Sequence, residues 1–325
     1  MKLDINNLSE LINDRIAQLD FGDKPLELYE PIRYIMQLGG KRMRPILAIL
    51  GYSLFDENSN NIIEPAIAVE VFHNFTLMHD DIMDRAPIRR GKATVHEKWN
   101  DNVAILSGDV MLVKAYDLLL KSPDDRLKKV LLAFNKCASE VCEGQQFDMN
   151  FETKDDVSVE DYLEMIRLKT AVLLGFSLEL GAILGGADHV TCQHLKQLGT
   201  DIGIGFQLKD DLLDVFGDQN KFGKQVGGDI IANKKTFLLI KALENAKGNT
   251  KQELRSWLEK KDFDKTEKVL AIKGIYDQLD IQKITQQKIN EYFDAGLKRF
   301  KALEIAAGKK EHLIGFINKL MNREK

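Results

Sequence analysis

The distribution of proline constrains the fold of this chain more than any other feature of its sequence. The chain has 325 residues and six prolines, and the last of these is Pro123. Because proline breaks helices, the long remainder of the chain is free to form long ones. Apolar residues three and four apart recur in Val159 to Gly185, Thr191 to Phe216 and Lys283 to Leu303, with no convincing period-two alternation. The sequence therefore predicts an all-α fold.

Turn-forming residues separate the expected helices, but none of these breaks resembles a linker between domains. The longest break runs from Gly217 to Asn233 and holds four glycines together with several charged residues. A loop of this length in a compact domain is usually functional, so we expect a lid there. We expect the whole chain, residues 1–325, to form a single domain.

Charge and cysteine content exclude several classes of protein. Lysine and arginine number 46 against 50 aspartates and glutamates, for a net charge of −4, so no global basic field favours nucleic acid. Cys137, Cys142 and Cys192 are too few and too irregularly spaced for a disulfide framework or a zinc site. We expect them to be small core residues of a protein in the reducing cytoplasm.

Neither a signal peptide nor a transmembrane segment is expected. The N-terminal residues lack the basic flank and apolar stretch of a signal peptide, and their apolar residues recur at helical spacing. The most apolar window, Ala171 to Gly186, is interrupted by Glu179 and is shorter than the roughly twenty residues that a spanning helix needs. A buried core helix explains this window better.

The pattern Asp-Asp-x-x-Asp occurs twice, and both copies lie in apolar helical surroundings. Residues i and i+4 of a helix project from nearly the same side, so the first and last aspartates of each copy can hold a hard cation between them. Magnesium suits such a half-site, because it takes one or two carboxylates and completes its shell with water and phosphate oxygens. The predicted metal ligands are Asp80, Asp81 and Asp84 in the first cluster and Asp210, Asp211 and Asp214 in the second.

A solvated helix face or a series of N-cap residues is the ordinary explanation of one isolated acidic cluster. Two clusters embedded in apolar sequence favour a metal site instead, because crowded carboxylates repel one another unless a positive charge lies among them. The two clusters together therefore indicate a metal site.

Basic residues accompany the two clusters. Lys41 and Arg44 lie three apart, beside the expected start of a helix, and can face one anion. Arg89 and Arg90 follow the first cluster, and adjacent arginines offer two differently directed forks for phosphate oxygens. Each pair alone is more often solvated surface charge, but together with the carboxylates the pairs favour the binding of two diphosphates.

Two further polar residues share helical stripes with the aspartates. His73 lies seven residues before Asp80, and Gln207 lies three residues before Asp210. A lone histidine on an apolar helix is often a satisfied core residue, but its place on this stripe favours a functional role.

Three lysines complete the candidate site. Lys169 stands beside Thr170 in an apolar helix, where an ammonium group without a nearby anion is costly. Lys224 and Lys234 flank the glycine-rich break and can close over a diphosphate. Solvated surface is the ordinary alternative for either of these two lysines alone.

Five strings of the sequence occur in the order typical of one enzyme family: GGKRMRP, HDDIMDRAPIRRG, LKT, GFQLKDDLLD and GKQVGGDIIANKKT. On these strings the chain resembles the trans-isoprenyl diphosphate synthases, or polyprenyl synthetases, and in particular the short-chain type that makes geranylgeranyl or farnesyl diphosphate. The resemblance runs from Gly39 to about Thr236. The C-terminus, Asn322 to Lys325, resembles the basic tail of some members only loosely, and we assign it no role.

The resemblance implies the isoprenoid synthase fold, a single bundle of long antiparallel helices around a central cavity, in a homodimer. The two clusters would face each other across the cavity mouth, with about three magnesium ions bridging them to an allylic diphosphate. Asp80 and Asp84 would hold two ions, and Asp210, with Asp214, the third. The residues that would contact the allylic diphosphate are Arg89, Lys169, Lys224 and Lys234, and those that would grip isopentenyl diphosphate are Lys41, Arg44, His73 and Arg90.

The implied reaction is magnesium-assisted ionisation, condensation and elimination. Metal and cationic side chains would stabilise the charge on the departing diphosphate of a dimethylallyl, geranyl or farnesyl substrate. The double bond of isopentenyl diphosphate would attack the allylic cation, and the released diphosphate would remove the last proton. Thr170 and Gln207 would steady the cation through their dipoles, and a closing lid would exclude water.

In this family the residues just before the first cluster set product length. Phe75 lies five positions before Asp80 with Thr76 after it, and Phe72 lies one turn earlier, where it can stack on Phe75. On an ideal wheel Phe75 is off the Asp80 stripe, so its role as a cavity floor comes from the resemblance alone. One ring followed by threonine is similar to members that make geranylgeranyl diphosphate, and two adjacent rings are typical of farnesyl diphosphate synthases. Plain core aromatics are the alternative.

Other functions compete with this one. His79-Asp80 is the central dipeptide of helical metal phosphohydrolases, but those need further histidines at wider spacing. A terpene cyclase would share the fold and metals without needing a second diphosphate grip. Two alternatives lie within the same family. One is a farnesyl or longer-chain polyprenyl synthase, and the other is a non-catalytic partner subunit of a hetero-oligomeric synthase. Such subunits usually lose aspartates, and all six are present here.

Overall fold

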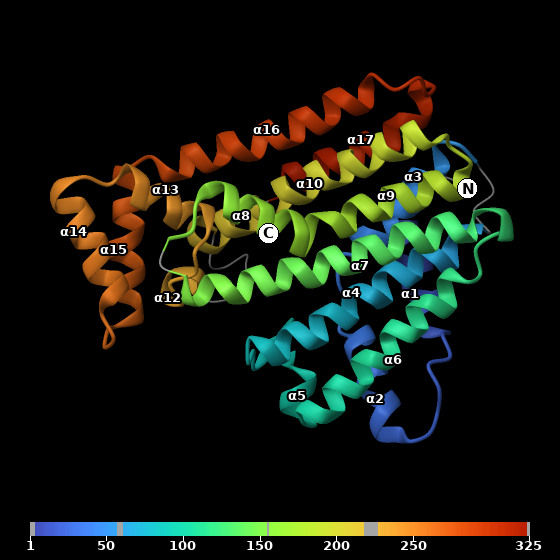
Figure 1. Ribbon diagram of the computed structural model, residues 1–325, viewed down its shortest axis with the longest axis horizontal. Helices are drawn as coiled ribbons and strands as arrows, with labels where there is room; N and C mark the ends of the chain where they lie inside the picture. The colour runs from blue at the N-terminus through green and yellow to red at the C-terminus, as the bar shows by residue number, and fades with distance from the viewer. Residues whose placement is uncertain (1–3, 57–60, 155, 218–226, 324–325) are drawn as a thin grey trace. The chain divides into compact units, whose positions relative to one another are not determined.

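Helices form nearly all of the secondary structure, which confirms the all-α prediction. The computed structural model describes residues 4–56, 61–154, 156–217 and 227–323, and it is 79% helical. In chain order the helices are α1 (Ile5–Ala17), α2 (Leu26–Gln37), α3 (Met43–Ser53), α4 (Ile63–Met83), α5 (Val95–Lys98), α6 (Asp101–Leu119), α7 (Asp124–Thr153), α8 (Val159–Ile166), the π-helix η2 (Arg167–Ala171), α9 (Val172–Gly185), α10 (His189–Phe216), α12 (Gly228–Ile231), α13 (Phe237–Asn245), α14 (Gly248–Glu259), α15 (Lys265–Gln278), α16 (Ile281–Lys301) and α17 (Ala307–Met321) (Figure 1).

The chain divides into two compact units, each of which we describe by itself. Boundaries between the units fall inside α7, α9, α10 and α17, so each of these helices belongs partly to both, and one more boundary follows α16. The prediction of one domain over residues 1–325 stays a prediction. Unit 1 comprises Met1–Cys137, Leu173–Lys196 and Leu303–Leu313, and unit 2 comprises Ala138–Val172, Gln197–Ala302 and Ile314–Lys325.

The core of unit 1 is built around α4, which packs against α3 and α6 (Figure 1). Ile67 and Val69 of α4 are fully buried, and burial of one such aliphatic side chain contributes about 1.5–3 kcal/mol. Gly181 of α9 lies against the backbone of α3, because a Cβ atom there would collide with the carbonyl oxygen of Ala48. The helix that carries the first aspartate cluster is therefore embedded in a tightly packed core.

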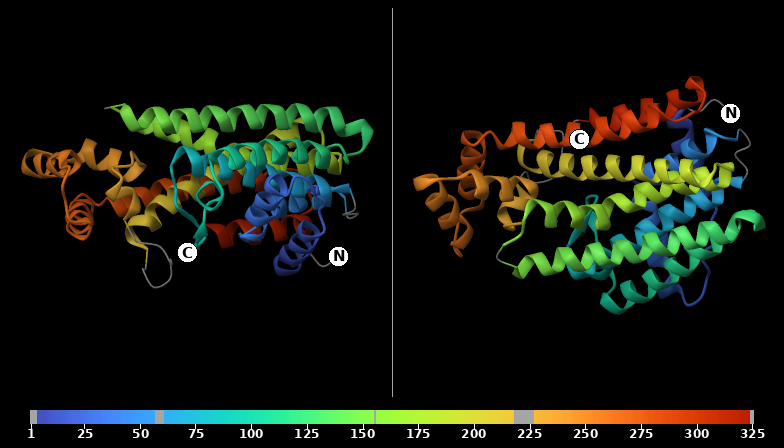
Figure 2. Two further views of the ribbon diagram at one scale, coloured as in Figure 1. Left: turned by 90° about the horizontal axis from the view of Figure 1, so that it is seen from below. Right: turned by 45° about the horizontal axis from the view of Figure 1, so that its top comes forward.

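In unit 2, α15 packs against α12, α14 and α16, and Figure 2 shows α14 and α15 as neighbouring orange helices. Phe293 of α16 is fully buried at Gly205 of α10, where a Cβ atom would collide with the phenylalanine ring. This contact fixes α10, which carries the second aspartate cluster, against α16.

A short β-hairpin, which the sequence analysis did not predict, follows the first cluster. Its strands are β1 (Ile88–Arg89) and β2 (Lys92–Ala93), paired antiparallel with Arg89 opposite Lys92. The two loop residues, Arg90 and Gly91, have φ angles of 51° and 74°, as the tightest hairpin turns require. The hairpin turns the side chains of the two adjacent arginines in different directions.

The apolar window Ala171 to Gly186, which we expected to be a short core helix, is part of a longer helical segment. Val159 to Gly185 is one helical stretch of 27 residues, long and apolar enough to cross a bilayer. Its most apolar window is 78% buried inside the protein, as is usual for a core helix. The length of this segment therefore does not distinguish it from a membrane span, whereas its burial is that of a core helix.

One of the three cysteines departs from the expectation that all lie in the core. All three are free thiols, with Cys137 and Cys192 buried but Cys142 exposed. Cys142 follows Cys137 by five residues on α7, and five residues turn a helix by about 140° from its starting direction. This rotation explains why the second of the two cysteines leaves the core.

Candidate active site

The first aspartate cluster lies at the C-terminal end of α4, in unit 1. Asp84 ends this helix, and its N–H donates to the carbonyl oxygen of Asp80 at 2.9 Å. Asp81 is buried, Asp80 is half-buried and Asp84 is exposed. The three carboxylates therefore differ in their access to solvent, with the middle one turned into the protein.

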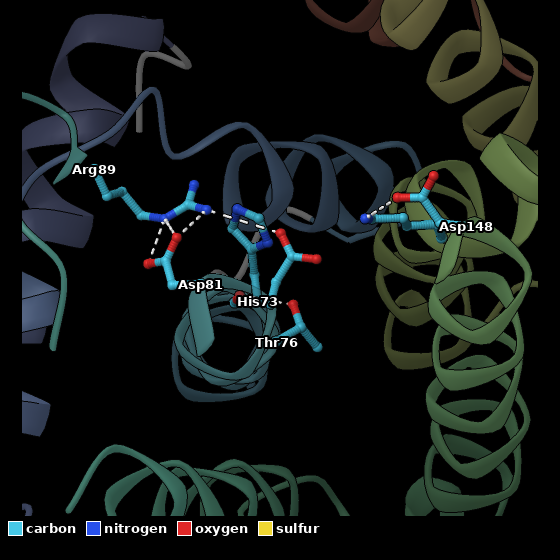
Figure 3. A network of polar contacts seen from close by, with 7 residues as sticks. His73, Thr76, Asp81, Arg89 and Asp148 are labelled. Atoms are coloured by element: carbon cyan, nitrogen blue, oxygen red, sulfur yellow. Dashed lines mark hydrogen bonds and ion pairs between the residues drawn. The ribbon is translucent and has the colours of Figure 1, made fainter. Parts of the chain in front are cut away.

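Arg89 grips the buried carboxylate of this cluster (Figure 3). Its Nε donates to both oxygens of Asp81, at 2.8 and 2.9 Å, and its Nη2 donates to Oδ1 at 2.7 Å. The same Nη2 lies 3.8 Å from Oδ2 of Asp80. Burial raises the pKa of Asp81, and the guanidinium opposes that rise. Because the two groups engage each other, Asp81 as a metal ligand and Arg89 as a diphosphate ligand stay predictions.

Arg42 anchors the segment that carries Lys41 and Arg44. Its Nη1 donates to Oε1 of Glu70 at 2.7 Å, and its Nη2 donates to the carbonyl oxygen of Met36 at 2.8 Å. The side chains of Arg42 and Glu70 are each 3% exposed, so this ion pair lies in the core of unit 1. Lys41 is exposed and Arg44 is half-buried. Arg42 thus stabilises the fold, whereas its neighbours Lys41 and Arg44 remain candidates for binding a substrate.

Arg90 also contacts this segment, at the two glycines that precede Lys41. One of its Nη groups donates to the carbonyl oxygen of Gly39. Its guanidinium also covers Gly40, where a Cβ atom would lie 2.9 to 3.0 Å from the guanidinium atoms. Gly40 has a φ of 142°, so both the backbone and the space require glycine at this position.

His73 of α4 lies among these arginines. Burial lowers its pKa well below the usual value, and the positive charges of Arg44 and Arg90 lower it further. The imidazole is therefore neutral at neutral pH and lies within the electrostatic reach of these guanidinium groups. The structure thus brings together Arg44, His73 and Arg90, three of the four residues predicted to grip isopentenyl diphosphate.

The aromatic residues before the first cluster form part of a larger ring cluster in unit 1. Phe72 is buried, with its ring centroid 5.6 Å from that of Phe75 and 5.0 Å from that of Phe134. Phe75 also meets the ring of His79 at 4.8 Å. The hydroxyl of Thr76 donates to the carbonyl oxygen of His73 at 2.8 Å (Figure 3). The predicted contact between Phe72 and Phe75 is confirmed, but the two ring planes are tilted by 47° and are not stacked in parallel. The role of these residues in product length stays a prediction.

The second aspartate cluster lies on α10, in unit 2, and its middle aspartate is also buried. Asp211 accepts hydrogen bonds from the phenol of Tyr162 and from Nε2 of Gln207, the latter at 3.0 Å. The Thr170 hydroxyl donates to Oε1 of Gln207 at 3.2 Å. Burial, reinforced by the negative charge of Asp229, raises the pKa of Asp211 to about 7. The structure thus joins Thr170, Gln207 and Asp211 in one chain of hydrogen bonds.

Lys169 and Thr170 lie in the π-helix η2, and π-turns inside α-helices often occur at functional sites. Nζ of Lys169 donates to Oδ2 of Asp148 at 2.6 Å; Figure 3 labels this aspartate. Burial favours the neutral carboxyl, but Lys234 and Lys169 outweigh it and lower the pKa of Asp148. Gly144 of α7 allows this approach, because a Cβ atom there would collide with the backbone of Lys169. An anion near Lys169 is therefore present, as predicted.

The last aspartate of the second cluster holds the chain where it enters α12. Oδ2 of Asp214 accepts a hydrogen bond from the N–H of Asp229 at 3.0 Å, and its carbonyl oxygen accepts one from Gly227 at 2.7 Å. Burial raises the pKa of Asp229 to about 6, although the charge of Lys234 opposes the rise. The predicted ligand Lys224, and most of the predicted lid, lie outside the described residues.

A C-terminal arginine contacts the second cluster, although the sequence analysis assigned the C-terminus no role. Arg323 forms an ion pair with Asp210, and its side chain is only 10% exposed. Its Nη2 also donates to the carbonyl oxygen of Phe206 at 3.2 Å, and its guanidinium carbon lies 3.6 Å from the centroid of the Phe206 ring. Such a cation–π contact favours the charged arginine at this place.

The donor atoms of both clusters fit magnesium, which prefers carboxylate oxygens. No group of three or more His, Cys, Asp or Glu side chains is arranged to hold an ion within the described ranges of the chain. Magnesium needs only one or two carboxylates when water and phosphate oxygens complete its shell. Asp80 with Asp84, and Asp210 with Asp214, can supply them. The facing of the two clusters across a cavity stays a prediction.

Four residues of the candidate site were missed by the sequence analysis: Asp148, Tyr162, Asp229 and Arg323. Asp148 lies 21 residues before its partner Lys169, so it carried no local signal. Tyr162 and Arg323 carried none, since their partners lie 49 and 113 residues away.

Comparison with known proteins gives consistent results. The profile of the polyprenyl synthetase family matches residues 25–276 of the chain. The geranylgeranyl diphosphate synthase of Methanosarcina mazei is 42% identical over 243 residues, which is 74% of this chain and 75% of that protein.

Solved structures agree with this likeness. A crystal structure of a geranylgeranyl pyrophosphate synthase is 42% identical, with a TM-score of 0.94 over 99% of both chains. A geranylgeranyl pyrophosphate synthase from Corynebacterium glutamicum, solved in complex with isoprenyl diphosphate and magnesium, is 29% identical, with a TM-score of 0.87 over 98% of this chain and 99% of that one.

Proposed function

The chain belongs to the polyprenyl synthetase family and is a prenyltransferase, and we propose that it condenses isopentenyl diphosphate with an allylic diphosphate to give geranylgeranyl diphosphate. The allylic substrate is dimethylallyl, geranyl or farnesyl diphosphate. The relatives support the reaction class and the twenty-carbon product, because the two most similar proteins described above carry that name.

One observation carries the proposal: a group of cationic side chains lies near the first aspartate cluster in unit 1. The charges of Arg44 and Arg90 act on the buried imidazole of His73 and lower its pKa, Arg90 donates to the carbonyl oxygen of Gly39, and Asp80 follows His73 by seven residues on α4. A diphosphate is a natural ligand of such a group, because guanidinium groups bind phosphate oxygens in forked geometry. A condensing enzyme needs this second grip beside its metal ligands, whereas a cyclase or a phosphohydrolase does not.

The reaction transfers an allylic group between two diphosphates. The allylic C–O bond breaks, and the diphosphate leaves with the bonding electron pair. The double bond of isopentenyl diphosphate supplies the pair for the new C–C bond, and the released diphosphate takes the proton whose loss restores a double bond. Lys169 and Lys234 stabilise the leaving group, together with Arg89 and Lys224. Thr170 and Gln207 steady the carbocation through their dipoles.

The residues that would hold magnesium are Asp80 and Asp84 in the first cluster and Asp210 with Asp214 in the second. When bound, about three magnesium ions would neutralise charge that builds up on the leaving diphosphate. The buried middle aspartates have a supporting role in this proposal. Asp81 orients Arg89, and Asp211 holds Gln207 beside Thr170.

Phe75 is the proposed floor of the chain-elongation cavity. Its ring is held between Phe72 and His79, so it cannot turn aside without disturbing the ring cluster. A single ring at this position supports the twenty-carbon product. Farnesyl diphosphate and longer prenyl products are the alternatives that an assay must exclude.

The proposed functional unit is one polyprenyl synthetase domain over residues 1–325, in a homodimer in the cytoplasm. An exposed apolar stripe on α6 and its C-cap residue supports the dimer: Leu106, Val113 and the C-cap Leu120 recur every seven residues and are 58%, 58% and 54% exposed. Residues at this spacing share one helix face, and such a face on a protein surface favours a partner. Light scattering after size-exclusion chromatography tests this, and Val113→Glu should shift the wild-type dimer to a monomer. A monomeric wild type would exclude the dimer.

The experiment that tests the function is a product assay. Purified protein is incubated with magnesium, radiolabelled isopentenyl diphosphate and each allylic starter, and the products are dephosphorylated and sized by chromatography. We expect a twenty-carbon product from at least one starter, and none when magnesium is removed by a chelator. A protein that folds but elongates no starter would contradict the proposal.

A further inference from the structure

The connection between α12 and α13, in unit 2, is held at several points. The N–H of Lys234 donates to the carbonyl oxygen of Asp229 at 2.9 Å, and the carbonyl oxygen of Lys234 accepts from the N–H of Thr236 at 2.8 Å. Both the N–H and the carbonyl oxygen of Lys234 are therefore hydrogen-bonded within this turn.

Lys235 attaches this connection to the end of α7. Its Nζ donates to the carbonyl oxygen of Phe151 at 2.5 Å and to that of Lys154. The last carbonyl groups of a helix lack partners within it and carry the negative end of its dipole, so they attract a cation. Lys235 thus serves as a cap, and its side chain is not available to the site.

Asn233 attaches the same connection to the opposite side. It has a φ of 52°, a left-handed conformation that asparagine tolerates better than most residues. Its Nδ2 donates to the carbonyl oxygen of Leu258 in the last turn of α14, at 3.0 Å. Its Oδ1 accepts a hydrogen bond from Nζ of Lys268 at 2.6 Å.

Lys268 of α15 is an unusual partner, because it is fully buried. Its ammonium group lies 4.1 Å from the centroid of the Phe263 ring, and burial lowers its pKa. In the part of the chain that the structure describes, its hydrogen bond goes to an uncharged amide and it forms no salt bridge. Lysine is almost never fully buried unless it is paired, because the charged form is costly to desolvate. If Asn233 needs this hydrogen bond to keep its place, that need would explain why position 268 holds a lysine.

Lys234 lies between these two attachments in the sequence, and it lines a small cavity together with Asp229 and Asn233. Its charge lowers the pKa of Asp148 and opposes the rise in the pKa of Asp229 and Asp211. These carboxylates belong to the second cluster or adjoin it, so Lys234 lies where a diphosphate would be bound.

We propose that Lys268 is a positioning residue that acts through Asn233 to hold Lys234 at the second aspartate cluster, where Lys234 contacts the allylic diphosphate. This inference rests on the proposed function, because it concerns the same substrate. It assigns a task in substrate binding to a buried side chain that does not itself touch the substrate.

The test compares four variants with the wild type. Lys268→Met keeps the length of the side chain and removes the donor. Asn233→Gly removes the acceptor while tolerating the positive φ, and Asn233→Asp keeps an acceptor for Lys268. Lys265→Met is the matched control, because Lys265 is an exposed lysine at the start of the same helix.

We expect Lys268→Met and Asn233→Gly to lower kcat/KM for the allylic diphosphate about tenfold, within the range that misplacement of a binding group produces. The KM for isopentenyl diphosphate should not change. Asn233→Asp keeps the acceptor for Lys268 but loses the donor to Leu258, so its kcat/KM for the allylic diphosphate should fall between those of the wild type and Asn233→Gly. Lys265→Met should keep both constants near wild type.

A double-mutant cycle with Lys234→Ala separates positioning from stability. If Lys268 acts only through Lys234, then adding Lys268→Met to Lys234→Ala should cause no further loss of kcat/KM for the allylic substrate. An additive loss, equal losses for both substrates, or an unchanged allylic constant would overturn the proposal. Should Lys268→Met fail to fold, the same cycle with Asn233→Gly decides the matter. A wild type that elongates no starter would instead refute the proposed function.

Discussion

The two aspartate clusters share a sequence pattern but not an environment. In the first, the buried carboxylate of Asp81 pairs with the guanidinium of Arg89, only eight residues further along the chain. In the second, the buried carboxylate of Asp211 accepts hydrogen bonds from two neutral groups, the phenol of Tyr162 and the amide of Gln207. The middle aspartate is thus stabilised by an ion pair in the first cluster and by hydrogen bonds from neutral groups in the second.

The arginines differ in the same way. The arginine of the second cluster is Arg323, near the C-terminus of the chain. It pairs with the first aspartate of the cluster, Asp210, which lies 113 residues earlier in the sequence. The comparison teaches that the pattern determines how carboxylates are spaced on a helix. Which carboxylate meets a positive charge is decided by distant segments that pack against that helix.

The largest expected effect tests whether the clusters are equal partners in catalysis. Asp80→Ala and Asp210→Ala should each lower kcat by about 10²–10³-fold or more, because each removes a carboxylate that would hold a metal ion at the leaving group. Circular dichroism should show an unchanged helical content. If either variant retains wild-type turnover, its cluster is dispensable and the comparison of two metal sites fails.

The next prediction concerns the residue five positions before each cluster, which is Phe75 in the first and Gly205 in the second. Only the first position carries a ring that can block an elongating chain. Gly205 has no side chain, and the space beside it is filled by the ring of Phe293. Phe75→Ala should therefore yield products longer than those of the wild type, measured by chromatography of the dephosphorylated chains. An unaltered product profile would exclude Phe75 as the floor.

A smaller effect distinguishes the two buried aspartates. Asp81→Asn should destabilise the protein by about 3 kcal/mol, because it removes the closest counter-ion of the partly buried Arg89 and leaves only the longer contact to Asp80. Asp211→Asn should cost about 1 kcal/mol or less, since its partners are neutral and an amide oxygen can still accept from one of them. Urea unfolding of both variants at pH 7 measures the difference. Equal losses would show that the two environments are energetically alike.

The smallest effect concerns the arginine of the second cluster. Arg323 places a cation on Asp210, so it competes with a divalent ion for that carboxylate. Arg323→Gln should therefore bind Mn²⁺ about fivefold more tightly, at the lower end of the usual range for coupled binding. Electron paramagnetic resonance of free Mn²⁺ measures this without turnover. Lys319→Gln, an exposed change on α17, is the control; unchanged or weaker binding by Arg323→Gln would refute the competition.

Local features of the site were well predicted from the sequence, and long-range features were not. The helical stripe that carries Asp80 and His73 follows from spacing alone, as does the adjacency of Phe72 and Phe75. The π-helix at Lys169 was not predicted, because the insertion of a residue into a helical turn depends on what packs against it. The capture of Asp210 by Arg323 was not predicted either.

By itself the sequence determined the all-α class, the two acidic clusters and the spacing of their carboxylates, because helical periodicity is a property of neighbouring residues. Only the tertiary structure decided which aspartates are buried, that Asp81 meets a guanidinium while Asp211 meets a phenol, and that Lys268 reaches Asn233. The physical reason is that ion pairs and buried hydrogen bonds depend on which segments pack together. Packing is a sum of many weak contacts over the whole chain, and no local pattern records it.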